Sequence, residues 1–194
     1  MMSDEMNNTI FDEFNGEKFD VLYVDPPWSF SSKKTGGTMK SGSDQIYGSM
    51  TLDELKALPV DKIAADNCLL VMWYVGAMPQ EAIDLVNAWG FTLKNMNGFM
   101  WNKLTKHGKP FFGMGHLTRA GSESAIFAVK GKFKPDSKGV RAVREEIVGR
   151  HSEKPAVFHD DIEKLAGKDK KLIELFARRA YPGWATWGNQ SPDE

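Results

Sequence analysis

The sequence predicts one α/β domain built on a mainly parallel β-sheet with helices on both faces. Residues 21–24 and 68–75 are short apolar runs whose length and β-branched or aromatic side chains are typical of buried strands. Residues 79–89 place apolar side chains at helical spacing and lead into another apolar segment, residues 91–101. Strands that alternate with helices in this way favour a parallel sheet covered on both sides.

The other elements follow from local sequence signals. Residues 51–54 (TLDE) form a capping box, which begins a short helix that ends before Pro59. The elements expected on similar grounds are a strand over residues 123–129, a strand or hairpin arm within the basic stretch 132–150, a helix over residues 155–165 with Pro155 in its first turn, and short strands over residues 173–176 and 185–187.

Length and composition bound the class of protein. The chain has 194 residues, which suits one domain over residues 19–194, preceded by an acidic N-terminal segment, residues 1–18, that is expected to be partly disordered. The single cysteine, Cys68, cannot form an intramolecular disulfide, and its apolar surroundings indicate a core side chain rather than a nucleophile. One cysteine and four scattered histidines show no metal-ligand spacing, so no metal is expected.

Charge and hydropathy limit the cellular location and the binding partners that can be expected. No apolar segment approaches the ~20 residues that cross a membrane, and the start of the chain does not resemble a signal peptide, so a cytoplasmic location is expected. The net charge is −1, but residues 130–154 carry eight basic and four acidic side chains. This stretch is either a solvated face or a contact for nucleic-acid phosphates, with Arg141 and Arg144 among the candidates.

Residues 19–28 (FDVLYVDPPW) hold the strongest candidate for a functional site. Proline cannot donate a backbone hydrogen bond and disfavours helical angles in the residue before it, so the strand is expected to end at Asp25. A carboxylate is then held at the carboxyl edge of the sheet, which is where ligands bind in open α/β folds. The alternative is an ordinary loop that ends a strand, with Trp28 packed in the core.

The DPPW motif and five further blocks resemble, in the same order, the MT-A70 family of S-adenosylmethionine-dependent N6-adenine methyltransferases, of bacterial or phage type. The resemblance covers residues 19–190 and implies a Rossmann-like methyltransferase fold in which the catalytic motif precedes the cofactor-binding block. The cytoplasm expected above is then that of a bacterial cell or a phage-infected host. The further blocks are residues 45–50 (QIYGSM), 115–116 with 121–123 (GH and GSE), 151–155 (HSEKP), 174–178 (ELFAR) and 188–190 (GNQ).

The resemblance assigns Asp25, Pro26, Pro27 and Trp28 to catalysis. The exocyclic amine of adenine is a weak nucleophile because its lone pair is delocalised into the ring. The Asp25 carboxylate and the Pro26 carbonyl can accept its two N–H groups, and the Asp25 anion stabilises the positive charge that the nitrogen gains during transfer. Trp28 and Tyr47 are expected to stack on the target base, which must be flipped out of a duplex or already unpaired; core packing is the alternative for both.

The remaining substrate contacts are expected from several segments. Glu123 matches the base pocket of the family, although a structural salt bridge explains it equally well. Residues 29–43 are expected to form a mobile loop that closes over the substrate, with lysines that meet phosphates; a plain linker is the alternative. The full set of expected substrate-binding residues is Tyr47, Glu123, Lys33, Lys34, His116, Arg119, Arg141 and Arg144.

The resemblance also implies a site for S-adenosyl-L-methionine. Lys154 and Arg178 can pair with the methionyl carboxylate of the cofactor. The family has an acidic cofactor contact before DPPW; no acid stands at the counted position, so Asp12 or an amide is expected to substitute. The full set of expected cofactor-binding residues is Asp25, Lys154, Phe176, Arg178, Asn189 and Gln190.

The leading hypothesis is therefore an active N6-adenine methyltransferase that acts on nucleic acid. DNA is favoured over RNA because the chain is compact and shows no added RNA-binding module. The alternatives are the same reaction on RNA, a catalytically silent nucleic-acid-binding partner subunit, and, more weakly, a protein that binds a free nucleotide. A homodimer or a partner subunit is also expected, since so small a domain has limited surface with which to hold a polymer.

Overall fold

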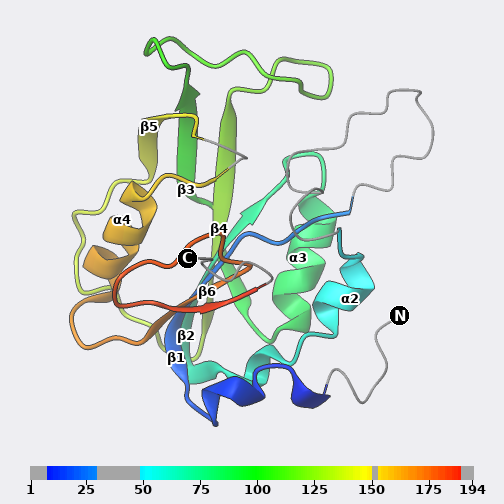
Figure 1. Ribbon diagram of the computed structural model, residues 1–194, viewed down its shortest axis with the longest axis vertical. Helices are drawn as coiled ribbons and strands as arrows, with labels where there is room; N and C mark the ends of the chain where they lie inside the picture. Colours follow the sequence, from blue (N-terminus) through cyan, green and yellow to red (C-terminus); the bar gives the residue numbers. More distant parts are fainter. Residues whose placement is uncertain (1–7, 30–48, 150–152, 189–194) are drawn as a thin grey trace.

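The computed structural model describes residues 8–29, 49–149 and 153–188, and these form one α/β sheet structure (Figure 1). The strands of the described residues make a seven-stranded sheet in the order β5-β3-β4-β2-β1-β6-β7. The strands are β1 (Phe19–Val24), β2 (Ala64–Tyr74), β3 (Thr92–Leu104), β4 (Ser122–Lys130), β5 (Val143–Ile147), β6 (Leu172–Leu175) and β7 (Ala185–Trp187). The helices are η1 (Asp12–Phe14), α2 (Leu52–Lys56), η2 (Val60–Lys62), α3 (Pro79–Ala88) and α4 (Val157–Ala166).

Most strand pairings are parallel. β1 pairs in parallel with β2 and β6, β6 with β7, and β3 with β5. Only β4 runs against its neighbours β2 and β3. The mainly parallel α/β fold predicted from the alternation of strands and helices is therefore confirmed, and every predicted strand is present with boundaries shifted by a few residues.

Helices cover both faces of the sheet, and alternate residues of β1 show which helices cover which face. Leu22 and Val24 belong to the apolar cluster that contains the buried residues of α2 and α3. Val21 and Tyr23 belong to the cluster on the other face, which contains the buried residues of α4. Figure 1 shows α2 and α3 on one side of the sheet and α4 on the other. Each buried large apolar side chain contributes about 1.5–3 kcal/mol, so these faces hold the sheet in place.

The predicted helix boundaries have the expected local causes. The side chain of Thr51 accepts a hydrogen bond from the Glu54 backbone N–H at 3.2 Å, and the Glu54 carboxylate accepts one from the Thr51 backbone N–H at 2.8 Å. The Thr51 hydroxyl also donates to the Glu54 carboxylate, at 3.1 Å, and the two bonds that this carboxylate accepts hold the pKa of the Glu54 carboxyl below its ordinary value. Pro79 lies in the first turn of α3, and Gly90 follows the helix with a φ of +79°.

The described part of the N-terminal segment packs on the sheet. Phe11 is buried, and its ring lies 4.9 Å from that of Trp187 between centroids. Asp12 forms an ion pair with Lys62 at 2.7 Å, next to the amino end of β2. The Asp12 carboxylate is therefore engaged by Lys62, and its expected substitution for the family's upstream acid stays a prediction.

The single cysteine is part of the core. Cys68 is fully buried in β2, and burial raises the pKa of its thiol to about 12. A thiol with so high a pKa is almost entirely protonated at neutral pH, which suits a core side chain and not a nucleophile. In the described ranges, no helix is long and apolar enough to cross a membrane.

Candidate active site

The DPPW segment leaves the sheet at the end of β1, as predicted. β1 ends at Val24, and Asp25 follows at the edge where β2 and β6 also end, since Val24 pairs with Met72 and with Leu175. The Pro26 carbonyl accepts the Trp28 N–H at 2.9 Å, and the Pro27 carbonyl accepts the Met50 N–H at 2.9 Å. A carbonyl oxygen has two lone pairs, so that of Pro26 keeps the capacity to accept one further N–H group.

Trp28 is placed differently from the stacking surface expected of it. Its side chain is 5 % exposed and belongs to the core cluster on the α2 side of the sheet. A parallel bridge to Met50 holds its backbone. The structure thus favours the core-packing alternative for Trp28, because a base can stack on this ring only after the ring has been uncovered.

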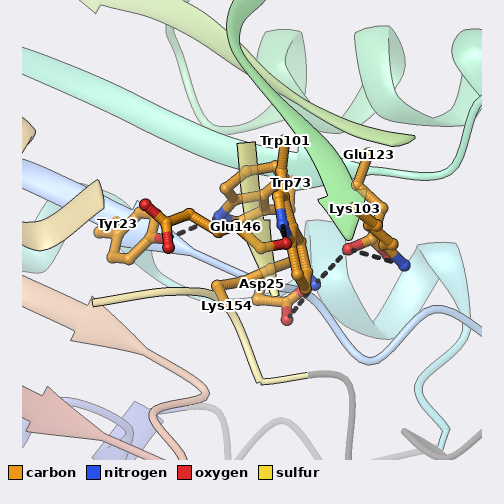
Figure 2. A network of polar contacts seen from close by, with 8 residues as sticks. All are labelled: Tyr23, Asp25, Trp73, Trp101, Lys103, Glu123, Glu146 and Lys154. Atoms are coloured by element: carbon orange, nitrogen blue, oxygen red, sulfur yellow. Dashed lines mark hydrogen bonds and ion pairs between the residues drawn. The ribbon is translucent and has the colours of Figure 1, made fainter. Parts of the chain in front are cut away.

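A chain of alternating charges connects Asp25 to two other strands (Figure 2). The ammonium of Lys154 lies 2.9 Å from a carboxylate oxygen of Asp25 and 3.3 Å from one of Glu123. Lys103, near the end of β3, lies 3.5 Å from the same Glu123 oxygen. Lys154 is also 5.4 Å from the centroid of the Trp73 ring, and its side chain is only 9 % exposed. Its position is therefore fixed by the residue that follows β1 and by side chains of β2 and β4.

In this network, the neighbouring charges shift the pKa values of Glu123 and Lys154 by more than burial does. Burial alone raises the pKa of the Glu123 carboxyl, but the charges of Lys154 and Lys103 outweigh it and leave the pKa below its ordinary value. Burial lowers the pKa of Lys154, while Asp25 and Glu123 raise it by more, so the pKa is raised overall. Lys154 and Glu123 are consequently both charged at neutral pH.

These contacts differ in part from the predicted roles. The salt bridge that the sequence allowed for Glu123 is present, with Lys103 and Lys154 as its partners. Lys154, predicted to pair with the carboxylate of the cofactor, is directed to the carboxylates of Asp25 and Glu123. The sequence did not indicate this bridge because Lys154 and Asp25 are 129 residues apart.

The lowered pKa of Glu123 predicts how its contribution to stability depends on pH. A carboxyl with a depressed pKa in the folded state stabilises the protein fully above its unfolded pKa, and this stabilisation is lost as the pH falls through the folded value. Glu123→Gln should therefore lower the melting temperature at pH 7, by about 2–4 °C for a loss of roughly 1 kcal/mol. Near pH 3 the difference from the wild type should shrink.

Thermal unfolding at both pH values checks this prediction. Glu145→Gln, which changes an exposed carboxylate on β5, is the control and should have little effect at either pH. If Glu123→Gln lowered the melting temperature by the same amount at pH 7 and at pH 3, the ion pair would not be the cause of the loss.

His159 and Glu174 belong to the site but were not predicted from the sequence. His159 Nε2 lies 2.8 Å from a Glu174 carboxylate oxygen, and the imidazole stacks on Tyr181 with centroids 4.3 Å apart. Glu174 is in β6, paired in register with Tyr23 of β1. The available signal for Glu174 was an acidic residue one position before the end of β6, the strand next to β1. No sequence signal pointed to His159, which lies on α4.

A small cavity opens between the ends of β1 and β6. One guanidinium nitrogen of Arg178, Nη1, is buried and has no hydrogen-bond partner among the described residues. Phe176, at the end of β6, has a left-handed backbone (φ 59°) and is buried, with its ring 5.4 Å from that of Trp187 between centroids. The residues that line the cavity are Asp25, Glu153, Lys154, His159, Glu174, Phe176, Arg178 and Arg179.

Apart from Glu123, whose salt bridges are described above, the predicted substrate-binding residues fall into three groups. Arg144 is not free for phosphate, because its guanidinium makes two hydrogen bonds to Asp161 of α4, at 2.6 and 2.7 Å. Arg141, His116 and Arg119 are exposed. Tyr47, Lys33, Lys34 and the predicted closing loop 29–43 after Ser29 lie outside the described residues, as do Asn189 and Gln190 of the cofactor set.

The fold holds an acidic motif at the carboxyl edge of a mainly parallel sheet, as α/β enzymes that bind their ligands at this edge do. The MT-A70 family model matches residues 19–190, which is most of the chain. The chain therefore belongs to the MT-A70 family of S-adenosylmethionine-dependent methyltransferases. The predicted resemblance, fold class and enzyme class are confirmed by this match.

Individual relatives agree with the family. The chain is 34 % identical over 201 residues to the type II methyltransferase M.MunI of a Mycoplasma species, covering 95 % of this chain and 82 % of that protein. It is 28 % identical to the human N(6)-adenine-specific methyltransferase METTL4, covering 89 % of this chain and 37 % of METTL4. It is 27 % identical to the N6-methyladenosine RNA methyltransferase MTA1 of Cryphonectria parasitica, covering 89 % of this chain and 51 % of MTA1.

Proposed function

We propose that this chain transfers the methyl group of S-adenosyl-L-methionine to the exocyclic N6 of adenine in nucleic acid, with DNA as the favoured polymer. The observation that carries the proposal is the Asp25 carboxylate, held at the carboxyl end of β1 in an intact DPPW motif. Two of the relatives are named as adenine or adenosine methyltransferases, which supports adenine as the target. The chain matches a larger share of the type II methyltransferase than of the RNA methyltransferase, which favours DNA.

Asp25 and Pro26 provide acceptors for the amine of the target base. Lys154 occupies one carboxylate oxygen of Asp25, which leaves the other oxygen and the second lone pair of the Pro26 carbonyl for the two N–H groups. An amine held in this way turns its lone pair toward the methyl group. Because the nitrogen gains positive charge only as the new bond forms, the Asp25 anion stabilises the transition state more than the ground state.

Lys154 and Glu123 set the charge around Asp25. The ammonium of Lys154 lies 2.9 Å from one oxygen of the Asp25 carboxylate and holds that acceptor in place. Alone, this positive charge would oppose the positive charge that develops on the adenine amine. Glu123 pairs with the same ammonium and offsets that effect. Lys154 is thus a positioning residue for Asp25 in the proposed mechanism.

The chemistry of the cavity fits S-adenosyl-L-methionine, which supplies an electrophilic sulfonium methyl group when bound. The buried, unpartnered Nη1 of Arg178 is a donor suited to the methionyl carboxylate. The Glu174 carboxylate is an acceptor suited to the ribose hydroxyls. Asn189 and Gln190 remain predicted contacts. The cavity holds about 20 Å³, so its lining side chains must move apart to admit a molecule of this size.

Methyl transfer from labelled cofactor tests the proposed function. Purified protein should be incubated with S-adenosylmethionine that carries a tritiated methyl group, and with duplex DNA, single-stranded DNA or RNA in separate reactions. We expect label in DNA in excess of RNA. Label in RNA alone would overturn the polymer preference. No label in any polymer, when calorimetry shows that the cofactor binds, would overturn the activity and favour a silent partner subunit.

Competition by small molecules tests the free-nucleotide alternative. If the polymer is the substrate, adenosine or AMP in millimolar excess should leave methylation of DNA almost unchanged. Strong inhibition, together with methylation of AMP itself, would favour the alternative. The predicted cytoplasmic location and the predicted homodimer or partner subunit are separate expectations that belong to this proposal.

A further inference from the structure

The segment that links β3 to β4, residues 105–121, forms a projecting arm, called here the β3–β4 arm. It leaves the sheet at the end of β3, on the edge where β1 leads into Asp25. This follows from the pairings, because β4 is antiparallel to both β2 and β3, so β3 runs in the same direction as β2 and β1. Figure 1 shows the arm extending beyond the rest of the described chain.

The β3–β4 arm exposes large apolar side chains that the fold does not use. Leu117 is 95 % exposed, Phe112 74 % and Met114 73 %, the three highest values among the exposed large apolar residues of the described chain. Exposed apolar groups gathered on one small element are unfavourable in water unless a partner covers them. The arm is therefore suited to contact another molecule.

The arm is ordered in advance of any such contact. Its backbone bonds include Phe111 N–H to the Lys103 carbonyl at 2.9 Å and a reciprocal pair between Gly113 and Ala120 at 2.7 and 3.2 Å. Leu117 has a left-handed backbone (φ 68°), which is strained for a side chain of this type. This turn holds Leu117 away from the rest of the described chain, so little backbone entropy is left to lose on binding.

The charge of the arm indicates the chemistry of the partner. Residues 105–121 contain Lys106, Lys109, Arg119 and two histidines, and no acidic residue. The guanidinium of Arg119 lies 4.9 Å from the Phe112 ring centroid, which places a cation directly beside the exposed aromatic group. Apolar side chains flanked by cations match stacked bases flanked by phosphates. They match a second copy of the same positive arm poorly.

The arm is connected to the candidate active site at its base. Lys103 lies 5.9 Å from the Phe111 ring centroid and forms an ion pair with Glu123, where β4 begins. Glu123 in turn contacts Lys154, the partner of Asp25. The same residues therefore anchor both the arm and the catalytic carboxylate, so a polymer held by the arm is positioned relative to Asp25.

We propose that the β3–β4 arm is a wedge that inserts the Leu117 side chain, supported by Phe112, between stacked bases of duplex DNA while the target adenine leaves the stack. This inference rests on the proposed function and extends it to the substrate form, a base-paired adenine. A duplex base must be extruded before its amine can be reached, and apolar side chains placed between base steps offset the stacking that is lost. The lysines and Arg119 then contact the flanking phosphates.

Leu117→Asn is the variant that tests the wedge. Asparagine tolerates a left-handed backbone, so the change removes the apolar tip without adding strain to the turn. Methylation is measured on native plasmid DNA and on the same DNA after heat denaturation. We expect kcat/KM on native DNA to fall about 10- to 100-fold, with a change of less than about threefold on denatured DNA. The double variant Phe112→Ser, Leu117→Asn should show the larger loss.

Permanganate reactivity provides a readout that does not depend on turnover. Permanganate oxidises unstacked thymines, so wild-type protein bound to native DNA should expose thymines opposite extruded adenines, and Leu117→Asn should not. Ile147→Ser is the matched control, because Ile147 is also an exposed large apolar residue (52 %) but lies on β5. It should behave as the wild type does in both assays.

The outcomes separate the wedge from the proposed function. A wild type that methylates no adenine in either form of DNA contradicts the proposed function. A wild type that methylates both forms, with equal losses for Leu117→Asn on each or none on either, overturns the wedge alone. If the variant instead changes the molecular mass in solution and leaves the ratio of native to denatured activity unaltered, the arm is a surface for protein association.

Discussion

Asp25→Ala should reduce kcat by about 10³-fold while the dissociation constant of S-adenosylmethionine changes by less than about threefold. The loss is large because the variant removes the acceptor of the amine N–H and the anion that stabilises the developing positive charge. It also leaves the Lys154 ammonium near that charge with one carboxylate fewer to offset it. Lys154 keeps its contact with Glu123, so the variant should still fold. Single-turnover methyl transfer and calorimetry provide the two measurements.

The control for this prediction is Asp66→Ala. Asp66 is an exposed carboxylate near the amino end of β2, at the opposite edge of the sheet from Asp25, so its loss should change neither kcat nor cofactor affinity. If Asp25→Ala abolished cofactor binding together with activity, Asp25 would hold the cofactor rather than the target amine.

Arg144→Ala should have the largest effect on stability of the changes considered. The two hydrogen bonds from Arg144 to Asp161 join β5 to α4, and the Asp161 side chain is only 5 % exposed. Removing the arginine leaves a carboxylate that is nearly buried and unpaired. Because Arg144 itself is about one third exposed, we expect a loss near 2 kcal/mol, below the full value for a buried pair, or about 4–8 °C in melting temperature.

Two further variants decide whether the lost ion pair is the cause. Arg141→Ala changes an exposed arginine in the same basic stretch and should leave the melting temperature within about 1 °C of the wild type. The double variant Arg144→Ala, Asp161→Asn should recover part of the lost stability, since it removes the unpaired charge. A melting temperature for Arg144→Ala equal to that of Arg141→Ala would contradict a structural role.

The ion pair between Arg144 and Asp161 changes which basic residues are expected to contact phosphates. Neutralising Lys138 and Arg141 together should reduce the dependence of DNA affinity on salt concentration, because each lost phosphate contact removes one released counterion. Arg144 no longer belongs in that set. An unchanged salt slope for the Lys138, Arg141 double variant would show that this stretch is a solvated face.

Features set by local sequence could be predicted. The end of β1 at Asp25 follows from two consecutive prolines, and the start of α2 follows from a capping box of four residues. The apolar run around Cys68 correctly indicated a central buried strand, because periodicity and length decide such elements without knowledge of the fold.

Features that depend on contacts between distant segments could not be predicted from the sequence. Lys154 reaches Asp25 only because the segment before α4 returns to the edge of β1, and no local pattern specifies that approach. Arg144 looked like one more cation in a basic stretch, since its partner Asp161 is defined only once β5 and α4 are packed. Trp28 gave the same aromatic signal whether it stacked on a base or filled the core, and its burial depends on the placement of α2.

The most direct test of the account is the chemical identity of the product. Native DNA should be incubated with the protein and S-adenosylmethionine with a ¹³C-labelled methyl group, digested to nucleosides and analysed by mass spectrometry. We predict label in N6-methyldeoxyadenosine, and none above background when Asp25→Ala replaces the wild type. Cytosine also carries an exocyclic amine, so label in N4-methyldeoxycytidine instead would contradict adenine as the target of this site.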